Sequence, residues 1–196
     1  MSYLVKAPKS YRADQSVTTY ERVPYKLARY LDTWDFGFFD RTGQVDPILE
    51  GPQAGRLSFR PNAARLQLVE PRAARYAGKV FLLVGPENSS ATFALARLAQ
   101  QWGAATLVGQ PTGGNQRGLN GGQLAWVTLP ESGVAVDIPL LATRYASGTP
   151  DAGVTPDIIV RRSFAAQAAG RDEEMEAVLQ SPAGQPGKAA AATVSP

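Results

Sequence analysis

Residues 79–109 read KVFLLVGPENSSATFALARLAQQWGAATLVG, and they carry the clearest structural signal in the chain. The continuous apolar run at residues 79–85 predicts a strand that is covered on both faces. Apolar residues then recur at helical spacing: Ala91, Leu95, Leu98 and Trp102. Gly103 is suited to end that helix, and residues 104–109 form a second apolar strand. Strand, helix and strand in this order predict a parallel βαβ unit with a right-handed crossover.

The remaining patterns predict one α/β domain around this unit. LAWVTL (124–129) and VAVDIPL (134–140) alternate, which predicts two strands joined by the turn PESG, with Val134, Val136, Ile138 and Leu140 on one face. RLQLVE (65–70) alternates as well. Upstream, four apolar residues recur at a spacing close to 3.6 and favour a short helix: Val23, Leu27, Leu31 and Trp34.

The boundaries of this domain follow from composition. Residues 1–21 show no sustained period and are expected to be irregular, and residues 22–180 are expected to form the domain. Within it, residues 163–180 contain a terminal helix whose acidic start, RDEEMEA, suits a helix N-terminus. Residues 181–196 are of low complexity and are predicted to be disordered.

Composition excludes several classes of function. The 196 residues include 20 Lys and Arg against 17 Asp and Glu, a net charge of +3 without a basic stripe, so a nucleic-acid partner is not expected. The chain has no cysteine and no histidine, so no thiolate or imidazole serves as nucleophile, base or metal ligand. No cofactor and no metal are predicted. No apolar run approaches the roughly 20 residues of a membrane span, and the first residues lack the apolar centre of a signal peptide.

Two adjacent serines, Ser89 and Ser90, stand where the first strand meets the helix. Serine is a preferred helix N-cap, because its side-chain oxygen accepts from the free N–H groups of the first turn, and the pattern alone favours this structural role. The same place also suits a nucleophile, since a hydroxyl at a sharp strand-to-helix turn is exposed beside backbone N–H groups that stabilise an oxyanion. The Gly-x-Ser-x-Gly elbow of the α/β-hydrolases is absent.

Three segments in fixed order carry a family resemblance: VFLLVGPENSSATFALARLAQQWGAATLVGQPTGGNQRGLNGG (80–122), LPESGVAVDIPL (129–140) and DAGVTPDIIV (151–160). Together they resemble the C-terminal half of the peptidase domain of the C-terminal processing (tail-specific) serine peptidases, a group that includes the tricorn protease core and retinoid-binding repeats. The resemblance implies a ClpP/crotonase-like parallel βαβ spiral. It also implies that this fold is incomplete at the N-terminus, with the second oxyanion donor and any base upstream.

The resemblance assigns roles residue by residue. SATFALA (90–96) is similar to a family pattern like Ser-Ala-Ser-Glu-Ile-Leu-Ala, which implies that Ser90 is the nucleophile, that the Ala91 N–H is an oxyanion donor and that Ser89 is a neighbour or cap. Ser/Lys members of the family place a lysine 25 residues after the nucleophile, where this chain has Asn115. Neither an amide nor the Arg117 guanidinium is a base at neutral pH.

The glycine-rich loop after the second strand is the other candidate for function. We expect Gly113, Gly114, Asn115 and Arg117 to line a substrate groove, because ligand crevices form at the carboxyl ends of parallel strands. Plain turn chemistry is an equally good interpretation. Asp151 and Asp157, further along, are expected to be structural.

The resemblance therefore implies a serine-type peptidase that acts on a peptide or protein substrate through an acyl-enzyme on Ser90, with low or no activity in this chain alone. A full-length relative with a signal peptide would be periplasmic or extracellular. Two alternatives remain open: a non-catalytic ligand- or peptide-binding module on the same fold, and a hydrolase of small esters or acyl groups.

Overall fold

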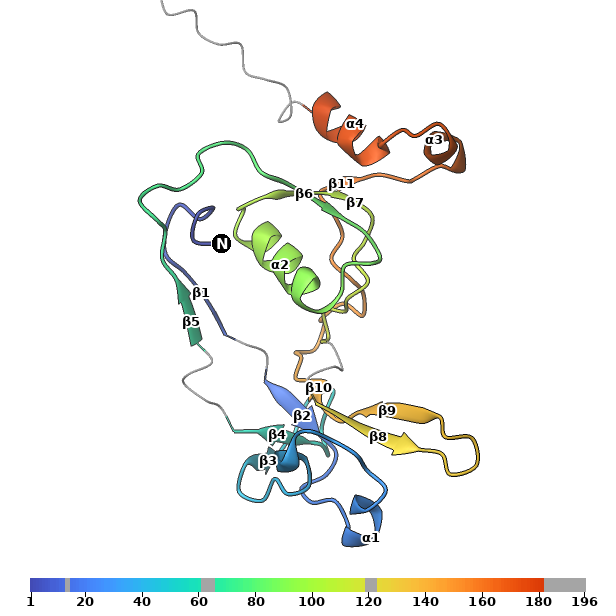
Figure 1. The fold of residues 1–196 in the computed structure, drawn as a ribbon. Helices are drawn as coiled ribbons and strands as arrows, with labels where there is room; N and C mark the ends of the chain where they lie inside the picture. Colours follow the sequence, from blue (N-terminus) through green and yellow to red (C-terminus); the bar gives the residue numbers. More distant parts are fainter. Residues whose placement is uncertain (13–14, 61–65, 119–122, 182–196) are drawn as a thin grey trace, which may run out of the picture. The chain divides into compact units, whose positions relative to one another are not determined.

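The computed structural model describes residues 1–12, 15–60, 66–118 and 123–181, and the chain divides into two compact units (Figure 1). Unit 1 comprises Met1–Ala7, Pro71–Gly113 and Val154–Pro196, and unit 2 comprises Pro8–Glu70 and Gly114–Gly153. Residues 182–196, most of the predicted disordered tail, lie outside the described residues.

Unit 1 is built on a three-stranded sheet in the order β11 (Ile158–Ile159), β7 (Thr106–Gly109), β6 (Phe81–Val84). Both pairs of neighbours run parallel. Helix α2 (Ser90–Gln101) connects β6 to β7, so the predicted parallel βαβ unit is confirmed. Helix α2 ends just before Gly103, as predicted, and Gly103 has a φ of 61°. In this conformation the N–H of Gly103 donates to the Gln100 carbonyl, and the N–H of Ala104 donates to the Ala99 carbonyl.

The buried face of α2 differs from the predicted stripe. Its buried residues are Phe93, Ala96 and Ala99, whereas Leu95 is 42% exposed. These three residues follow one another at intervals of three along the helix, and two of them are alanines, whose small side chains permit the helix to lie close to β7. The sequence pattern weighted the larger leucines and so selected the wrong face.

Strand β6 is also less covered than its apolar sequence predicts. Leu83 is 41% exposed, while Leu107 and Val108 of β7 are fully buried. The reason lies in the strand order, because β7 is central and β6 is at the edge of this sheet. The expectation of cover on both faces therefore holds for β7 and fails for β6.

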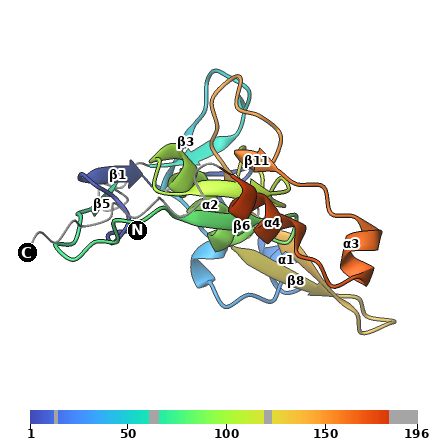
Figure 2. The ribbon, with the colours of Figure 1, turned by 90° about the horizontal axis from the view of Figure 1, so that it is seen from above.

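Residues 163–180 form two helices rather than one, α3 (Phe164–Ala168) and α4 (Glu173–Gln180), separated by Gly170 with a φ of 67°. Side chains cap both: Ser163 accepts from the N–H of Ala166, and Asp172 accepts from the N–H of Met175. Helices α2 and α4 both contact β7, and they lie on opposite faces of the sheet (Figures 1 and 2).

The described residues of unit 2 form three small antiparallel sheets. β1 (Lys9–Arg12) pairs with β5 (Leu66–Val69), and a second sheet has the order β10 (Ala142–Thr143), β2 (Ser16–Thr18), β4 (Leu57–Phe59), β3 (Val45–Pro47). The third is the predicted hairpin of β8 (Leu124–Thr128) and β9 (Ala135–Pro139). Residues 1–21, expected to be irregular, thus contain β1 and β2, because both strands pair with partners distant in sequence.

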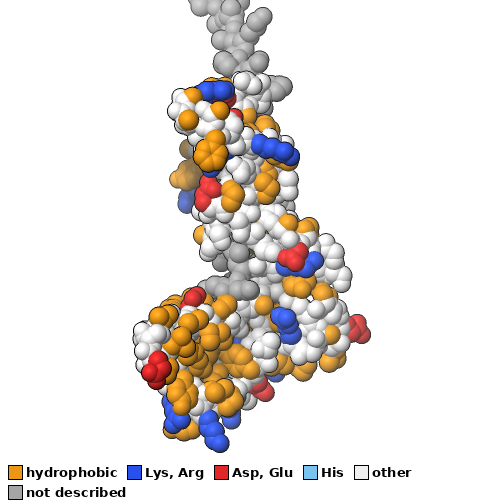
Figure 3. Space-filling model, turned by 90° about the vertical axis from the view of Figure 1, so that its right-hand side faces the viewer, with side chains coloured by type: hydrophobic (Ala, Val, Ile, Leu, Met, Phe, Trp, Pro, Cys, Tyr) orange, Lys and Arg blue, Asp and Glu red, His pale blue; other side chains and the backbone are white. Residues whose placement is uncertain are grey.

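The helical stripe at residues 23–34 yields less helix than its spacing suggests. Only α1 (Tyr25–Ala28) forms within these residues, and the short 3-10 helix η1 (Phe36–Phe38) follows them. Leu27 is 55% and Trp34 67% exposed, so these residues have no core to bury them within unit 2. Figure 3 shows hydrophobic side chains gathered on one face of this unit. Within the described ranges, no helix combines the length and the apolar character required to cross a membrane.

The core of unit 2 encloses an arginine. Arg41 is 1% exposed, and its guanidinium carbon lies 4.3 Å from the ring centre of Tyr20 and 5.1 Å from that of Phe59. Its Nη2 donates to the Oε1 of Gln123, whose own Nε2 donates to Asp35. Burial lowers the pKa of Arg41 below its ordinary value. The side chain therefore connects the start of β8 to the segment before β3.

Candidate active site

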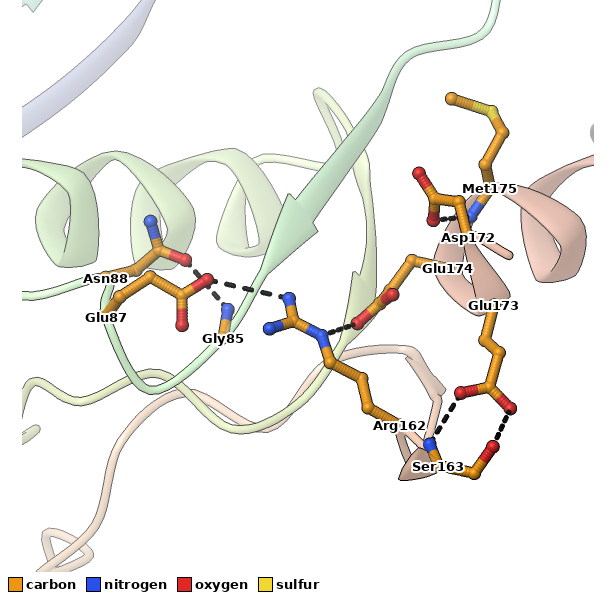
Figure 4. A network of polar contacts seen from close by, with 9 residues as sticks. All are labelled: Gly85, Glu87, Asn88, Arg162, Ser163, Asp172, Glu173, Glu174 and Met175. Carbon is orange, nitrogen blue, oxygen red and sulfur yellow. Dashed lines mark hydrogen bonds and ion pairs between the residues drawn. The ribbon is translucent and has the colours of Figure 1, made fainter. Parts of the chain in front are cut away.

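A closed turn links β6 to α2 and sets the start of the helix. The N–H of Asn88 donates to the Gly85 carbonyl over 3.0 Å, and the N–H of Gly85 donates to the Asn88 side-chain oxygen over 2.7 Å. Figure 4 shows Asn88 folded back on Gly85 in this way. The two bonds fix residues 85–88 and thereby the direction in which the next residues leave the strand.

Ser89 and Ser90 differ in backbone conformation. Ser89 is extended, with φ −122° and ψ 176°, and its carbonyl accepts from the N–H groups of Thr92 and Phe93 and from the Thr92 hydroxyl. Ser90 has a φ of 52°, and within the described residues it is the only residue other than glycine with a positive φ. This left-handed conformation costs an L-residue about 1–2 kcal/mol, and such strain gathers at functional sites.

The two hydroxyls do not cap the helix. Ser89 occupies the N-cap position, yet its side chain makes no cap hydrogen bond. Ser90 is exposed at the first position of α2, as is Ala91 after it. The Ala91 N–H belongs to the first turn, whose N–H groups have no carbonyl partner inside the helix and carry the positive end of the helix dipole. An exposed hydroxyl thus stands beside an N–H group suited to bind negative charge.

Two glycines, the last residue of β7 and one in the loop after it, pack closely against the end of β6 and the turn that follows it. Gly109 has a φ of 129°, and a β-carbon there would overlap the Val84 carbonyl oxygen. A β-carbon on Gly113 would overlap the Pro86 carbonyl oxygen in the same manner. Backbone therefore packs against backbone at both positions. Gly113, one of the expected groove residues, thus packs against the turn before Ser90 through its contact with Pro86.

The other expected groove residues, Gly114, Asn115 and Arg117, belong to unit 2. The Asn115 amide donates to Asp151 over 2.7 Å, and Arg117 forms an ion pair with the same carboxylate at 2.9 Å. Arg117 also donates to the Thr149 carbonyl. Asp151 is thus structural, as expected from the sequence. It engages the side-chain nitrogen of Asn115, while the side-chain oxygen of Asn115 accepts from the N–H of Arg117.

Asp157 has a structural role as well. Its Oδ2 accepts from the N–H of Leu107 over 2.8 Å and its Oδ1 accepts from the Gln100 side chain over 2.8 Å. The carboxylate therefore ties the last turn of α2 to the second residue of β7. Among the described residues, no group of three or more His, Cys, Asp or Glu is placed to hold a metal ion.

An ion network beside the turn was not foreseen from the sequence (Figure 4). Arg162 hydrogen bonds through Nε to Glu174 of α4, and its Nη2 lies 3.6 Å from Glu87. The hydrogen bond to the Glu174 carboxylate raises the pKa of Arg162 above its ordinary value. The acidic residues within 171–177 predicted only the start of a helix. A local pattern does not show which distant arginine pairs with a given glutamate.

Comparison with protein families places this chain in one of them. The family model of peptidase family S41 matches residues 11–160. The chain therefore belongs to peptidase family S41. The match begins well before Val80, where the quoted resemblance begins.

A solved structure of a candidate peptidase from Parabacteroides merdae is also similar to this chain, with 15% sequence identity and a TM-score of 0.49. The alignment covers 91% of this chain and 44% of the other, so the chain spans less than half the length of that relative. The comparison with curated proteins gives no match.

Proposed function

We propose that this chain supplies the nucleophile of a serine peptidase of the C-terminal processing (tail-specific) type and that Ser90 is that nucleophile. One observation carries the proposal: in a chain of family S41, an exposed serine with a φ of 52° begins the helix after the first parallel strand. Strain of this kind at a serine is expected where a hydroxyl has to face a substrate.

The chemistry of the proposal is acyl transfer. The Ser90 oxygen attacks the carbonyl carbon of a peptide bond, the carbon–nitrogen bond breaks, and the amine leaves with the proton that the hydroxyl gives up. Water then hydrolyses the ester. We propose that the Ala91 N–H, with the positive end of α2 behind it, stabilises the oxyanion. Because the chain has no histidine and has asparagine at position 115, acylation is expected to be slow.

We propose that the glycine-rich loop binds the peptide or protein substrate. The Asn115 and Arg117 side chains are already engaged with Asp151, so the loop would offer backbone groups instead. The loop follows the carboxyl end of β7, the usual place for a ligand in a parallel sheet. The β6–α2–β7 unit and its parallel neighbour β11 also favour a ClpP/crotonase-like spiral, which we propose as the complete fold.

A second candidate is a non-catalytic peptide-binding module on the same fold. It is favoured by one observation, the engagement of Asn115 in a structural hydrogen bond where a catalytic lysine would otherwise stand. This candidate predicts peptide binding that does not depend on Ser90.

Hydrolysis of an unfolded protein substrate separates the two candidates. The chain, Ser90→Ala and Ser89→Ala are incubated with the substrate, and new amino termini are counted over time. We expect slow cleavage by the chain and by Ser89→Ala, and only background cleavage by Ser90→Ala. Cleavage by Ser90→Ala at the rate of the unchanged chain would refute the proposal. Binding of the substrate by all three proteins with no cleavage would establish the second candidate.

A further inference from the structure

Arg162 lies at the same edge of the sheet as the turn before Ser90. Strands β6, β7 and β11 are parallel, so their carboxyl ends share one edge. The turn of residues 85–90 follows β6, and Arg162 comes three residues after the end of β11. The N–H of Val160 donates to the Gly109 carbonyl over 2.8 Å, which keeps the chain beside β7 as far as Val160, two residues before Arg162.

Helix α4 holds Arg162 firmly. Glu174, in the first turn of α4, is 7% exposed, and its Oε1 accepts from the Arg162 Nε. The neighbouring Glu173 accepts from both the N–H and the hydroxyl of Ser163, over 2.6 and 3.1 Å. Glu173 and Glu174 thus bind Ser163 and Arg162, two successive residues after β11. These bonds to α4 hold the Arg162 side chain independently of its contact with the turn.

The second partner of Arg162 belongs to the turn itself. Arg162 Nη2 lies 3.6 Å from the Glu87 carboxylate, and Glu87 sits between the two residues that close the turn, Gly85 and Asn88. Figure 4 shows the Arg162 guanidinium between Glu87 and Glu174. A lone exposed ion pair contributes little, because both side chains lose freedom on pairing. Here Arg162 is already ordered by a buried partner, so the contact with Glu87 costs less entropy.

We propose that Arg162 is a positioning residue, held by Glu174 of α4, that fixes the turn carrying Ser90 through its contact with Glu87. The proposal rests on the proposed role of Ser90, but the positioning itself is a property of the fold. It makes α4, which is distant from Ser90 in the sequence, part of the support for the nucleophile.

Backbone amide NMR tests the positioning without any chemistry. Glu87→Gln weakens the link to the turn and leaves the Arg162–Glu174 contact in place, whereas Arg162→Gln removes both contacts. Arg171→Gln is the matched control. Arg171 precedes α4 and pairs with Glu176 of that helix, and no contact of Arg171 with the turn is found among the described residues. We expect the first two variants to shift and broaden the amide signals of Asn88, Ser89 and Ser90.

The control is expected to leave these three signals unchanged, and Arg162→Lys, which keeps the charge, is expected to restore them in part. The inference is wrong if Glu87→Gln gives the signals of the unchanged chain, or if Arg171→Gln shifts them as much. Glu87→Gln decides the matter even where Arg162→Gln does not fold, because it leaves the buried Glu174 with its partner.

Labelling by a fluorophosphonate adds a kinetic readout. Small displacements of a reacting atom cost up to about 10²-fold in rate, so we expect Glu87→Gln to lower the maximal labelling rate of Ser90 about tenfold with the half-saturating probe concentration unchanged. An unchanged maximal rate would contradict the inference. A chain that is not labelled at all would refute the proposed role of Ser90 instead, and the amide signals would then decide the positioning alone.

Discussion

Gly113 lies so close to the carbonyl oxygen of Pro86 that a β-carbon at position 113 would overlap this oxygen. The contact joins the loop after β7 to the turn between β6 and Ser90, both in unit 1. Since both partners are backbone, neither side is able to move away by a rotamer change.

Gly113→Ala is therefore expected to destabilise the protein by about 3 kcal/mol, the cost of overpacking against rigid backbone. Gly103→Ala is the matched control, because Gly103 has a φ of 61° but open space around its α-carbon. It is expected to cost about 1 kcal/mol from backbone strain alone. Urea unfolding measures both values. Equal losses in the two variants would show that the contact with Pro86 is not tight.

Ser90→Gly is expected to raise the free energy of unfolding by about 1 kcal/mol, because glycine adopts a φ of 52° without the strain that an L-residue carries. Ser89→Gly, at an extended residue, relieves no strain and is expected to lower stability through the greater freedom of the unfolded chain. Thermal and urea unfolding of both variants tests this. A loss of stability in Ser90→Gly as large as in Ser89→Gly would argue against strain at Ser90.

Glu176 provides a test of pH dependence. Its carboxylate accepts two hydrogen bonds from the Arg171 guanidinium, at 2.9 and 2.5 Å, and they hold the pKa of Glu176 below its ordinary value. A pKa that is lower in the folded than in the unfolded chain stabilises the fold above the ordinary glutamate pKa, and this contribution is lost as the pH falls through the folded value.

Arg171→Ala is expected to return the Glu176 pKa toward its ordinary value, as followed by carboxyl-carbon NMR during an acid titration. Asp40 serves as an internal reference, because it belongs to unit 2 and not to the unit that holds Arg171. Its pKa is lowered mainly by the hydrogen bond with the Thr42 side chain. Its titration is expected to stay the same in the variant. A Glu176 titration that does not move in Arg171→Ala would contradict the paired geometry.

The central parallel unit was predictable because its signals are local. Two apolar runs with a helical segment between them define β6, α2 and β7, and Gly103 marks the helix end. Strands β1 and β2 escaped prediction because their pairing partners lie far along the chain, and short polar strands carry no alternation of their own. The face of α2 was misjudged because the fit of Ala96 and Ala99 against β7 depends on close approach rather than on hydrophobicity.

The candidate site was predictable only in part. The position of Ser90 at the helix start follows from the order of strand and helix. No local residue pattern signals its positive φ or the closed turn of Gly85 and Asn88 before it. The network of Arg162 was not predictable, since it joins residues separated by up to 75 positions, from Glu87 to Arg162. Sequence patterns report neighbours along the chain and not such pairs.

Covalent labelling shows directly whether Ser90 is a nucleophile. The chain, Ser90→Ala and Ser89→Ala are each incubated with a fluorophosphonate, digested, and searched by mass spectrometry for the adduct within residues 80–97, the peptide released at Lys79 and Arg97. One adduct, on Ser90, is expected in the unchanged chain and in Ser89→Ala, and none in Ser90→Ala. An adduct that persists in Ser90→Ala, or no adduct in any of the three proteins, would contradict the role of Ser90 as nucleophile.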